Sequence, residues 1–220
     1  MRKTFETYIA NNRRYLLIFL AVWCVLLLVG LRYTRAEAHL ILNSVHNPLL
    51  DIIFKNITHI GGSFPIIFGF VLLLWNVRKG LFILFGQLCC ALITVPLKTF
   101  FAHQRPSIFF IYNLRIDLPA VVEGVLLRTE NNSFPSGHTS AVFALATCLA
   151  AITPPKYRQW QIVWLVIGWL VAYSRIYLSQ HFVDDILFGS VIGVFSGLIV
   201  YLLCYRKEWG EYPLIRIRKH

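Results

Sequence analysis

Residues 186–205 read ILFGSVIGVFSGLIVYLLCY, a run of 20 residues without a charged side chain. About 20 apolar residues in a helix cross the hydrocarbon core of a bilayer, so this run has the length of a transmembrane helix. The rest of the chain has the same character: 57% of its 220 residues are hydrophobic, only 14% are charged, and the mean hydropathy is +0.64. A water-soluble domain could not hide so much apolar surface, and the sequence therefore predicts a membrane protein.

Six segments are candidates to cross the membrane, and the expected fold is an all-α, polytopic membrane protein with six transmembrane helices. The first, third and sixth segments are unambiguous. The fourth and fifth reach full length only by including polar residues at one end, Ser136–His138 and Ser174–Gln180. No repeat or low-complexity linker divides the chain, so residues 1–220 are expected to form a single membrane-embedded domain. The six predicted spans are Tyr15–Leu31, Ile60–Val77, Leu81–Phe101, Ser136–Thr153, Trp160–Gln180 and Ile186–Tyr205.

The positions of Lys and Arg predict the orientation of these spans. With six spans, the two termini and the short loops around Arg78 and Lys156 lie on one side and hold 13 of the 21 Lys and Arg residues. This side is expected to be the cytoplasm. The same topology explains the net charge of +11 better than nucleic-acid binding does, because the cations lie between apolar runs. The 13 residues are Arg2, Lys3, Arg13, Arg14, Arg78, Lys79, Lys156, Arg158, Arg206, Lys207, Arg216, Arg218 and Lys219.

The first segment has an alternative interpretation as a signal peptide. Basic residues precede it, and Ala36-Glu37-Ala38 resembles a small-residue cleavage site. The apolar run is long for a signal peptide, however, and cleavage would leave five spans. A retained transmembrane helix is favoured.

Two longer segments lie on the non-cytoplasmic side. Residues 102–134 contain Asp117, Glu123 and Glu130 and are too polar for lipid, so they are expected to form a lid or a substrate-reading loop. In residues 47–60, apolar and charged side chains separate onto opposite helical faces. This pattern fits a helix lying in the membrane interface, and it fits a packed connector equally well.

Three glycines recur every fourth residue in the last span, at Gly189, Gly193 and Gly197. Such a stripe lets another helix approach closely. The partner helix can belong to the same chain or to a second copy, so the sequence does not predict the oligomeric state.

Polar residues collect at the non-cytoplasmic ends of four spans, where a charged side chain suggests a functional site. Lys98 and Arg105 share a face at the end of the third span if that helix continues to Pro106. Alone, they could simply extend their charges to the interface. The other three ends add Ser136, Gly137 and His138, then Ser174 and Arg175, then His181 and Asp185.

This set of residues suits phosphoryl transfer. Lys98, Arg105 and Arg175 can balance the charge of a phosphate ester, and Ser136 and the Gly137 amide at a helix start can donate further hydrogen bonds.

Two histidines can serve a two-step displacement, in which one imidazole attacks phosphorus and the other moves protons. Asp185, four residues after His181, can hold that imidazole in one tautomer.

Three stretches together resemble the complete three-part signature of the type 2 phosphatidic acid phosphatase family. They are KTFFAHQRP at 98–106, PSGH at 135–138 and SRIYLSQHFVDD at 174–185. The resemblance implies that His181 is the nucleophile, His138 the acid and base, and Asp185 the residue that orients His181. It implies that no metal or other cofactor is needed. The phosphate ligands that it implies are Lys98, Arg105, Ser136, Gly137 and Arg175.

A metal site made by His138, His181 and Asp185 is the alternative to this assignment. The three cations expected beside these residues would repel a divalent ion, so the metal-independent interpretation is favoured.

The expected substrate is a membrane lipid, whose headgroup enters the cationic pocket while its chains stay in the bilayer. In a bacterium the family suggests lipid A phosphate, polyprenyl diphosphate, phosphatidylglycerophosphate or phosphatidic acid, and lipid A phosphate is favoured. The enzyme is expected in the plasma (bacterial inner) membrane, with its site on the extracytoplasmic face and no nucleic acid as partner. A lipid phosphotransferase using the same site and an anion or lipid transporter are the alternatives.

Overall fold

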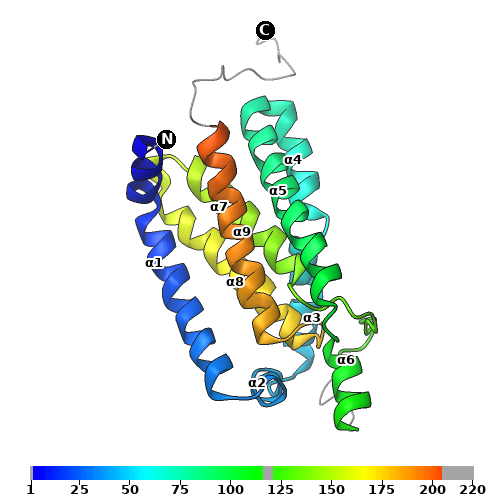
Figure 1. Cartoon of the computed structure of the whole chain (residues 1–220). Helices are drawn as coiled ribbons and strands as arrows, with labels where there is room; N and C mark the ends of the chain where they lie inside the picture. Colours follow the sequence, from blue (N-terminus) through cyan, green and yellow to red (C-terminus); the bar gives the residue numbers. More distant parts are fainter. Residues whose placement is uncertain (1, 116–120, 205–220) are drawn as a thin grey trace.

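The computed structural model describes residues 2–115 and 121–204, and every regular element within these ranges is a helix (Figure 1). The predicted all-α class is therefore confirmed. Short helical turns also cover Thr58–Gly61, Phe109–Leu114 and Pro155–Tyr157. The helices are α1 Arg2–Arg32, α2 Arg35–Leu42, α3 Pro48–Ile57, α4 Phe64–Trp75, α5 Val77–Phe101, α6 Pro106–Ile108, α7 Gly137–Ile152, α8 Gln159–Tyr177 and α9 Val183–Cys204.

Several helices have the length and the apolar composition of membrane spans. Fewer than six of them meet both criteria, however. Among the described residues, three helical stretches are long and apolar enough, Lys3–Arg32, Val77–Leu114 and Val183–Cys204. A fourth is reached only if Pro48–Gly61 and Phe64–Trp75, which are bent by 56° against each other, count together. The remaining two predicted spans correspond to the 16-residue α7 and to α8, which carries Gln and Arg side chains.

The last predicted span ends at Tyr205, which lies outside the described residues. The cations Arg206, Lys207, Arg216, Arg218 and Lys219, used to orient the chain, also lie outside them.

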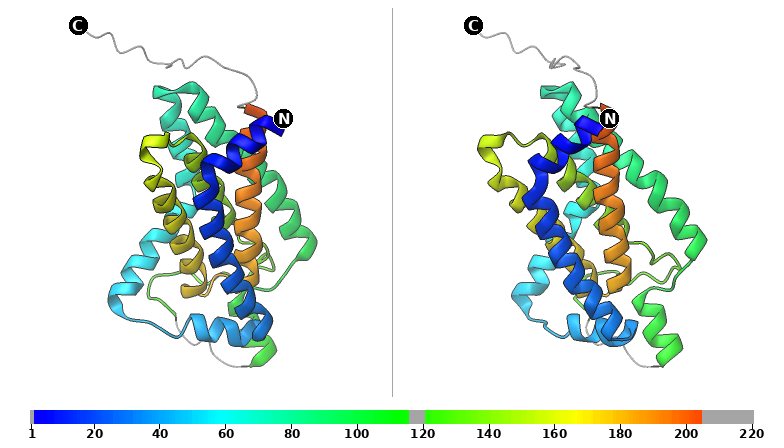
Figure 2. Two further views of the ribbon diagram at one scale, coloured as in Figure 1. Left: turned by 90° about the vertical axis from the view of Figure 1, so that its left-hand side faces the viewer. Right: turned by 60° about the vertical axis from the view of Figure 1, so that its left-hand side comes forward.

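The long helices run beside one another in alternating directions (Figures 1 and 2). The start of α1 and the end of α9 lie at one end of the bundle, and α2, α3 and α6 lie at the opposite end, which we call the site end. Short connections enforce this order: Asn76 alone separates α4 from α5, and its side chain accepts a hydrogen bond from Lys79 N at the start of α5.

Helix α7 forms the centre of the bundle. Its Val142, Phe143 and Ala144 side chains are buried, and it packs against α1, α5, α8 and α9. Peripheral helices instead direct apolar side chains outward, as Leu28 of α1 and Leu92 of α5 do with 65% and 67% exposure. In a bilayer these outward side chains contact lipid.

Helix α3 uses both of its faces. Phe54 is buried against Tyr173 and Tyr177 of α8, whereas Leu49 and Ile53 are exposed. The segment 47–60 thus combines the two interpretations that its pattern allowed, a packed connector and a helix with an outward apolar face.

The glycine stripe of α9 packs on α7 within the chain. A Cβ atom at Gly189 would lie 2.7 Å from the Ser136 carbonyl oxygen, and one at Gly197 would lie 2.7 Å from Thr147 Cβ. At Gly193 it would collide with the Ser140 carbonyl oxygen. Because the obstacles are largely backbone atoms of α7, a side chain on α9 would push the two helices apart.

The substitution Gly193→Ala is therefore expected to lower the free energy of unfolding by about 1–3 kcal/mol. Gly30→Ala in α1 is the matched control, since a Cβ atom there would meet no atom within 4 Å. Thermal unfolding of the detergent-solubilised variants measures the difference. Equal midpoints for the two variants would contradict the close packing of α7 and α9.

Candidate active site

His181 and Asp185 form a buried pair at the site end. His181 Nδ1 lies 3.3 Å from Asp185 Oδ2, and the two residues are 2% and 0% exposed. The expectation that His181 opens the last helix is wrong, because α9 begins at Val183. The contact forms nevertheless, since Asp185 Oδ2 also accepts the Phe182 backbone N–H at 2.9 Å and so closes the turn that carries His181.

Two further donors fill the acceptor positions of Asp185. Ser133 Oγ donates to Oδ2 at 2.5 Å and lies 3.4 Å from His181 Nδ1. Arg35 Nη2 donates to Oδ1 at 2.9 Å. This network favours the tautomer in which Nδ1 of His181 carries the proton, which leaves the Nε2 lone pair free.

The charge state of His181 follows from its surroundings. Burial lowers the pKa of His181 well below its usual value, and the positive charges of Arg175, Arg105 and Lys98 lower it further. The imidazole is therefore neutral near pH 7 and able to act as a nucleophile.

Lys98 and Arg105 both donate hydrogen bonds to Asn132, a loop residue, but they do not lie on one continuous helix. Helix α5 ends at Phe101 and Ala102 adopts a left-handed conformation with φ 45°, so Arg105 is not on the same helix as Lys98. Lys98 Nζ donates to the Asn132 carbonyl oxygen at 2.6 Å. Arg105 Nε and Nη2 donate to Asn132 Oδ1 at 2.9 and 2.7 Å.

Arg175 adds a third cation, itself buried, from the end of α8. Its Nη1 donates to Thr58 Oγ1 at 2.6 Å, and its buried Nε has no hydrogen-bond partner among the described residues. The charges of Lys98, Arg105 and Arg175 interact with one another. Three cations gathered in one place form a site suited to a phosphate group.

The start of α7 faces this cationic pocket. Ser136 caps the helix by accepting hydrogen bonds from Thr139, so its own hydroxyl proton remains available to a ligand. Its backbone N–H donates to the Asp185 carbonyl oxygen at 2.9 Å and joins α7 to α9. Gly137 lies beside Lys98, because a Cβ atom at Gly137 would be 3.7 Å from Lys98 Cε.

His138 follows in the first turn of α7, and the backbone of Gly61 and Gly62 packs on it. A Cβ atom at Gly61 would lie 2.6 Å from the His138 carbonyl oxygen, and one at Gly62 would lie 3.6 Å from its Nε2. His138 interacts electrostatically with Arg175 and His181. The structure thus brings together all eight residues proposed from the sequence.

Several neighbours in this site were not found from the sequence. Asn132 and Ser133 lie three and two residues before the PSGH stretch, in the order Asn132-Ser133-Phe134-Pro135, and this proximity in sequence was their only signal. Thr58 gave none. The only signal for Arg35 was its position on the predicted non-cytoplasmic side, which holds fewer Lys and Arg residues than the other side.

One group of side chains has the composition of a metal site. Donor atoms of His103, Asp184 and Asp185 lie within 4.8 Å of one another. Arg35 pairs with both carboxylates, at 3.0 Å for Asp184 Oδ2 and 2.9 Å for Asp185 Oδ1. A guanidinium on both carboxylates does not fit a divalent cation in the same place.

The segment 102–134, expected to cover the site, is described except for residues 116–120, so Asp117 lies outside the described residues. Its remaining parts are attached at several points. Ser107 Oγ donates to the Arg128 carbonyl oxygen at 2.5 Å, and Gln180 Nε2 donates to that of Leu126 at 3.1 Å. The segment therefore lies against the residues that precede His181.

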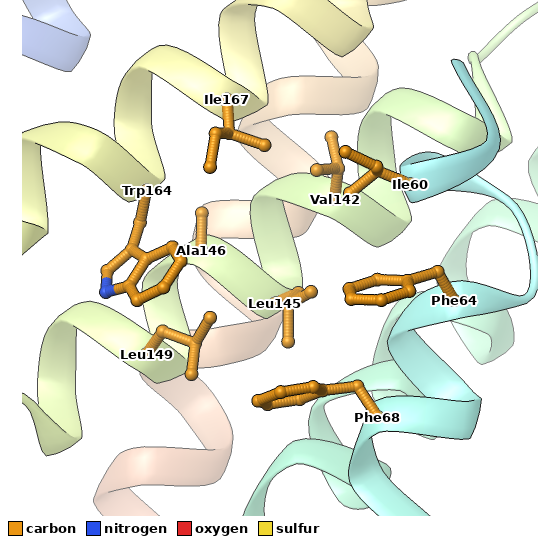
Figure 3. A pocket seen from close by; sticks show the side chains of 9 residues that line it. All are labelled: Ile60, Phe64, Phe68, Val142, Leu145, Ala146, Leu149, Trp164 and Ile167. Carbon is orange, nitrogen blue, oxygen red and sulfur yellow. The ribbon is translucent and has the colours of Figure 1, made fainter. Parts of the chain in front are cut away.

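An apolar groove of about 250 Å³ starts one helical turn beyond His138, at Val142 (Figure 3). Phe64 and Phe68 of α4 face Leu145 of α7 across it, and side chains of α8 close the other side. Its lining also includes Ile60, Ala146, Leu149, Trp164 and Ile167.

Comparison with known proteins agrees with this site. The model of the PAP2 superfamily matches residues 79–209. A lipid A 4'-phosphatase of Porphyromonas gingivalis is 36% identical over 181 residues, covering 77% of this chain and 73% of that protein.

Two solved structures share the fold. The crystal structure of Aquifex aeolicus LpxE has a TM-score of 0.60 at 26% identity and covers 76% of this chain and 94% of its own. A transmembrane PAP2-type phosphatidylglycerolphosphate phosphatase of Bacillus subtilis has a TM-score of 0.61 at 22% identity and covers 94% and 99%. With the family match spanning more than half of its length, the chain belongs to the PAP2 superfamily and is a membrane lipid phosphatase, a hydrolase of lipid phosphate esters.

Proposed function

We propose that this chain hydrolyses a phosphate monoester of lipid A, without a metal and through a phosphohistidine at His181. The observation that carries the choice of substrate is the likeness to a lipid A 4'-phosphatase, which extends over about three quarters of both proteins. The 4'-phosphate is accordingly the first position to test.

The location in the cell is part of the same proposal. The protein lies in the plasma membrane, which is the inner membrane of a bacterium with lipid A, as a single domain with both termini in the cytoplasm. The site end then faces the extracytoplasmic side. The sequence supports this orientation, because the segments predicted to be cytoplasmic hold 13 of the 21 Lys and Arg residues.

In the first step, Nε2 of His181 attacks phosphorus while the bond from phosphorus to the lipid oxygen breaks. Asp185 accepts a hydrogen bond from the Nδ1–H group of His181 and stabilises the positive charge that forms on the imidazole. His138 gives a proton to the departing lipid oxygen.

The charge on the transferred phosphoryl group is balanced by its ligands during this step. Lys98, Arg105 and Arg175 hold the non-bridging oxygens, and Ser136 and the Gly137 amide donate hydrogen bonds to them.

In the second step, His138 accepts a proton from water, and the resulting hydroxide attacks phosphorus as the bond to His181 Nε2 breaks. The products are inorganic phosphate and the free enzyme. Lys98 and Arg105 donate hydrogen bonds to oxygens of Asn132. For these two cations to bind phosphate, the loop that carries Asn132 moves aside. The segment 102–134 therefore acts as a lid.

The groove shown in Figure 3 supports a substrate with fatty chains. Its lining is apolar, it lies between helices of the membrane bundle, and it begins one turn from His138. A chain of the bound lipid can lie there while its phosphate occupies the cationic pocket.

Replacing the nucleophile is expected to abolish turnover. His181→Ala should release no phosphate above background, and His138→Ala should be slower by about 10²–10⁴-fold because proton transfer is lost in both steps. His59→Ala, at an exposed histidine outside the motifs, is the control and should keep wild-type activity.

Acid-labile, alkali-stable labelling of quenched wild-type protein from a 4'-radiolabelled lipid identifies the intermediate. Labelling that persists in His181→Ala would contradict the assigned nucleophile.

Activity is expected to withstand removal of divalent cations. Arg35 pairs with the carboxylates near His103, and the phosphate site has three cations of its own, so a metal has no part in the proposed steps. Phosphate release is measured with and without EDTA. A loss that added Mg²⁺ or Zn²⁺ reverses would show that the metal-independent mechanism is wrong.

Lipid A is expected to be the best substrate in a panel that includes polyprenyl diphosphate, phosphatidylglycerophosphate and phosphatidic acid. Inorganic phosphate and new phospholipid products are both quantified, which separates hydrolysis from transfer to another lipid. Preferred release from a different lipid would overturn the choice of substrate and keep the chemistry. Anion flux through reconstituted vesicles without phosphate release would favour the transporter.

A further inference from the structure

We propose that Arg35 is a positioning residue, which fixes the Asp185 carboxylate for the reaction at His181. The inference rests on the proposed function of the same site. Arg35 stands outside the three motifs and 44 positions before the start of the PAP2 match at residue 79, so neither assigns it a role.

Arg35 binds two neighbouring carboxylates at once. Its Nη2 lies 2.9 Å from Asp185 Oδ1 and 3.0 Å from Asp184 Oδ2, and its Nε donates to Asp184 Oδ1 at 3.1 Å. The planar guanidinium also lies over the Phe182 ring, 4.2 Å from its centroid. A flat group with several donors in a fixed fork can make these contacts together, and an ammonium group cannot.

The backbone that carries Arg35 is itself held in place. Arg35 is the first residue of α2, and the preceding Thr34 caps this helix. The Thr34 side chain accepts a hydrogen bond from Glu37 N, and the Glu37 carboxylate accepts hydrogen bonds from Thr34 N and Oγ1 at 2.9 and 2.8 Å. This reciprocal capping fixes the point from which the Arg35 side chain extends.

The two oxygens of Asp185 have different partners. Oδ2 faces Ser133, the Phe182 amide and His181, whereas Oδ1 faces Arg35. Arg35 thus holds the oxygen that His181 does not use, and the carboxylate cannot rotate without breaking this contact. Without Arg35, a fully buried acceptor would lose its charged donor.

Other charged groups face Asp185 but do not replace this contact. Lys98, Arg105 and His39 interact with it electrostatically, and Asp184 is its like-charged neighbour. Of these groups, Lys98 and Arg105 are cations that can offset part of the lost charge. Without the guanidinium between them, however, the adjacent carboxylates of Asp184 and Asp185 repel each other and shift away from the position that suits His181.

Arg35 could instead serve only to attach α2 to α9, and Asp184 allows this to be tested. Asp184→Asn weakens the attachment through Arg35 but leaves the contact between Arg35 and Asp185 intact. A role in attachment alone predicts similar kinetics for Asp184→Asn and Arg35→Gln. A positioning role predicts that only the loss of Arg35 slows the chemical step.

The experiment compares kcat and KM of wild type, Arg35→Gln, Arg35→Lys and Asp184→Asn on the lipid that wild type hydrolyses fastest. We expect Arg35→Gln to lower kcat by about 10–100-fold, the range typical for loss of a residue that orients another, with KM within about twofold. Arg35→Lys should recover part of kcat, because it restores the charge without the fork. Asp184→Asn should stay within about threefold of wild type.

Unfolding midpoints are measured on the same preparations. If Arg35→Gln lowers the midpoint, Arg35→Lys decides: a reduced kcat at a wild-type midpoint supports positioning, and wild-type kcat overturns it. Equal kinetics for Arg35→Gln and Asp184→Asn, or a change in KM alone, also overturn it. Wild-type protein that releases no phosphate from any lipid overturns both this inference and the proposed function.

Discussion

The buried carboxylate of Asp185 is the contact on which the site end depends. A charged group with no exposed surface has to be surrounded by donors, and here these come from three separate parts of the chain. Arg35 arrives with α2, Ser133 with the long loop, and His181 and the Phe182 amide with the turn before α9. The same residue accepts the Ser136 amide through its backbone and thereby also sets where α7 begins. Asp185 therefore links α2, the loop and the turn before α9 through its side chain, and α7 through its backbone.

The cationic pocket beside Asp185 holds like charges close together. This repulsion lowers the stability of the folded protein but favours the binding of an anion. Lys98, Arg105 and Arg175 repel one another, and most of their donors are met by neutral oxygens of Asn132, Gln180 and Thr58. The exposed Glu130 carboxylate lies 3.7 Å from Arg105 Nε and offsets part of this charge. In the proposed mechanism, a phosphate dianion supplies the remaining negative charge and relieves the repulsion. Local rules of stability are commonly broken at functional sites in this way.

Much of the site could be predicted because its residues lie at the ends of apolar runs, where sequence position and spatial position coincide. The grouping of Ser136, His138 and Arg175 required only that helix ends on one side of a membrane lie near each other. Lys98 and Arg105 would share a helical face only if the third helix continued to Pro106, and this condition is not met because Ala102 takes a left-handed conformation. Arg35 and Asp185 are 150 residues apart, and no periodicity predicts such a contact. The count of six spans also exceeded what length and composition support, since α4 and α7 are short and α8 is partly polar.

The position of Asn132 has a consequence for turnover. Its two oxygens take the same donors that a phosphate needs, so every ligand of Lys98 and Arg105 competes with a group that is tethered to the enzyme and never diluted. A lipid can offset this competition with the contacts of its chains, whereas inorganic phosphate has no chain to contribute. If Lys98 and Arg105 bind phosphate as proposed, the loop acts against the product more than against the substrate and limits product inhibition.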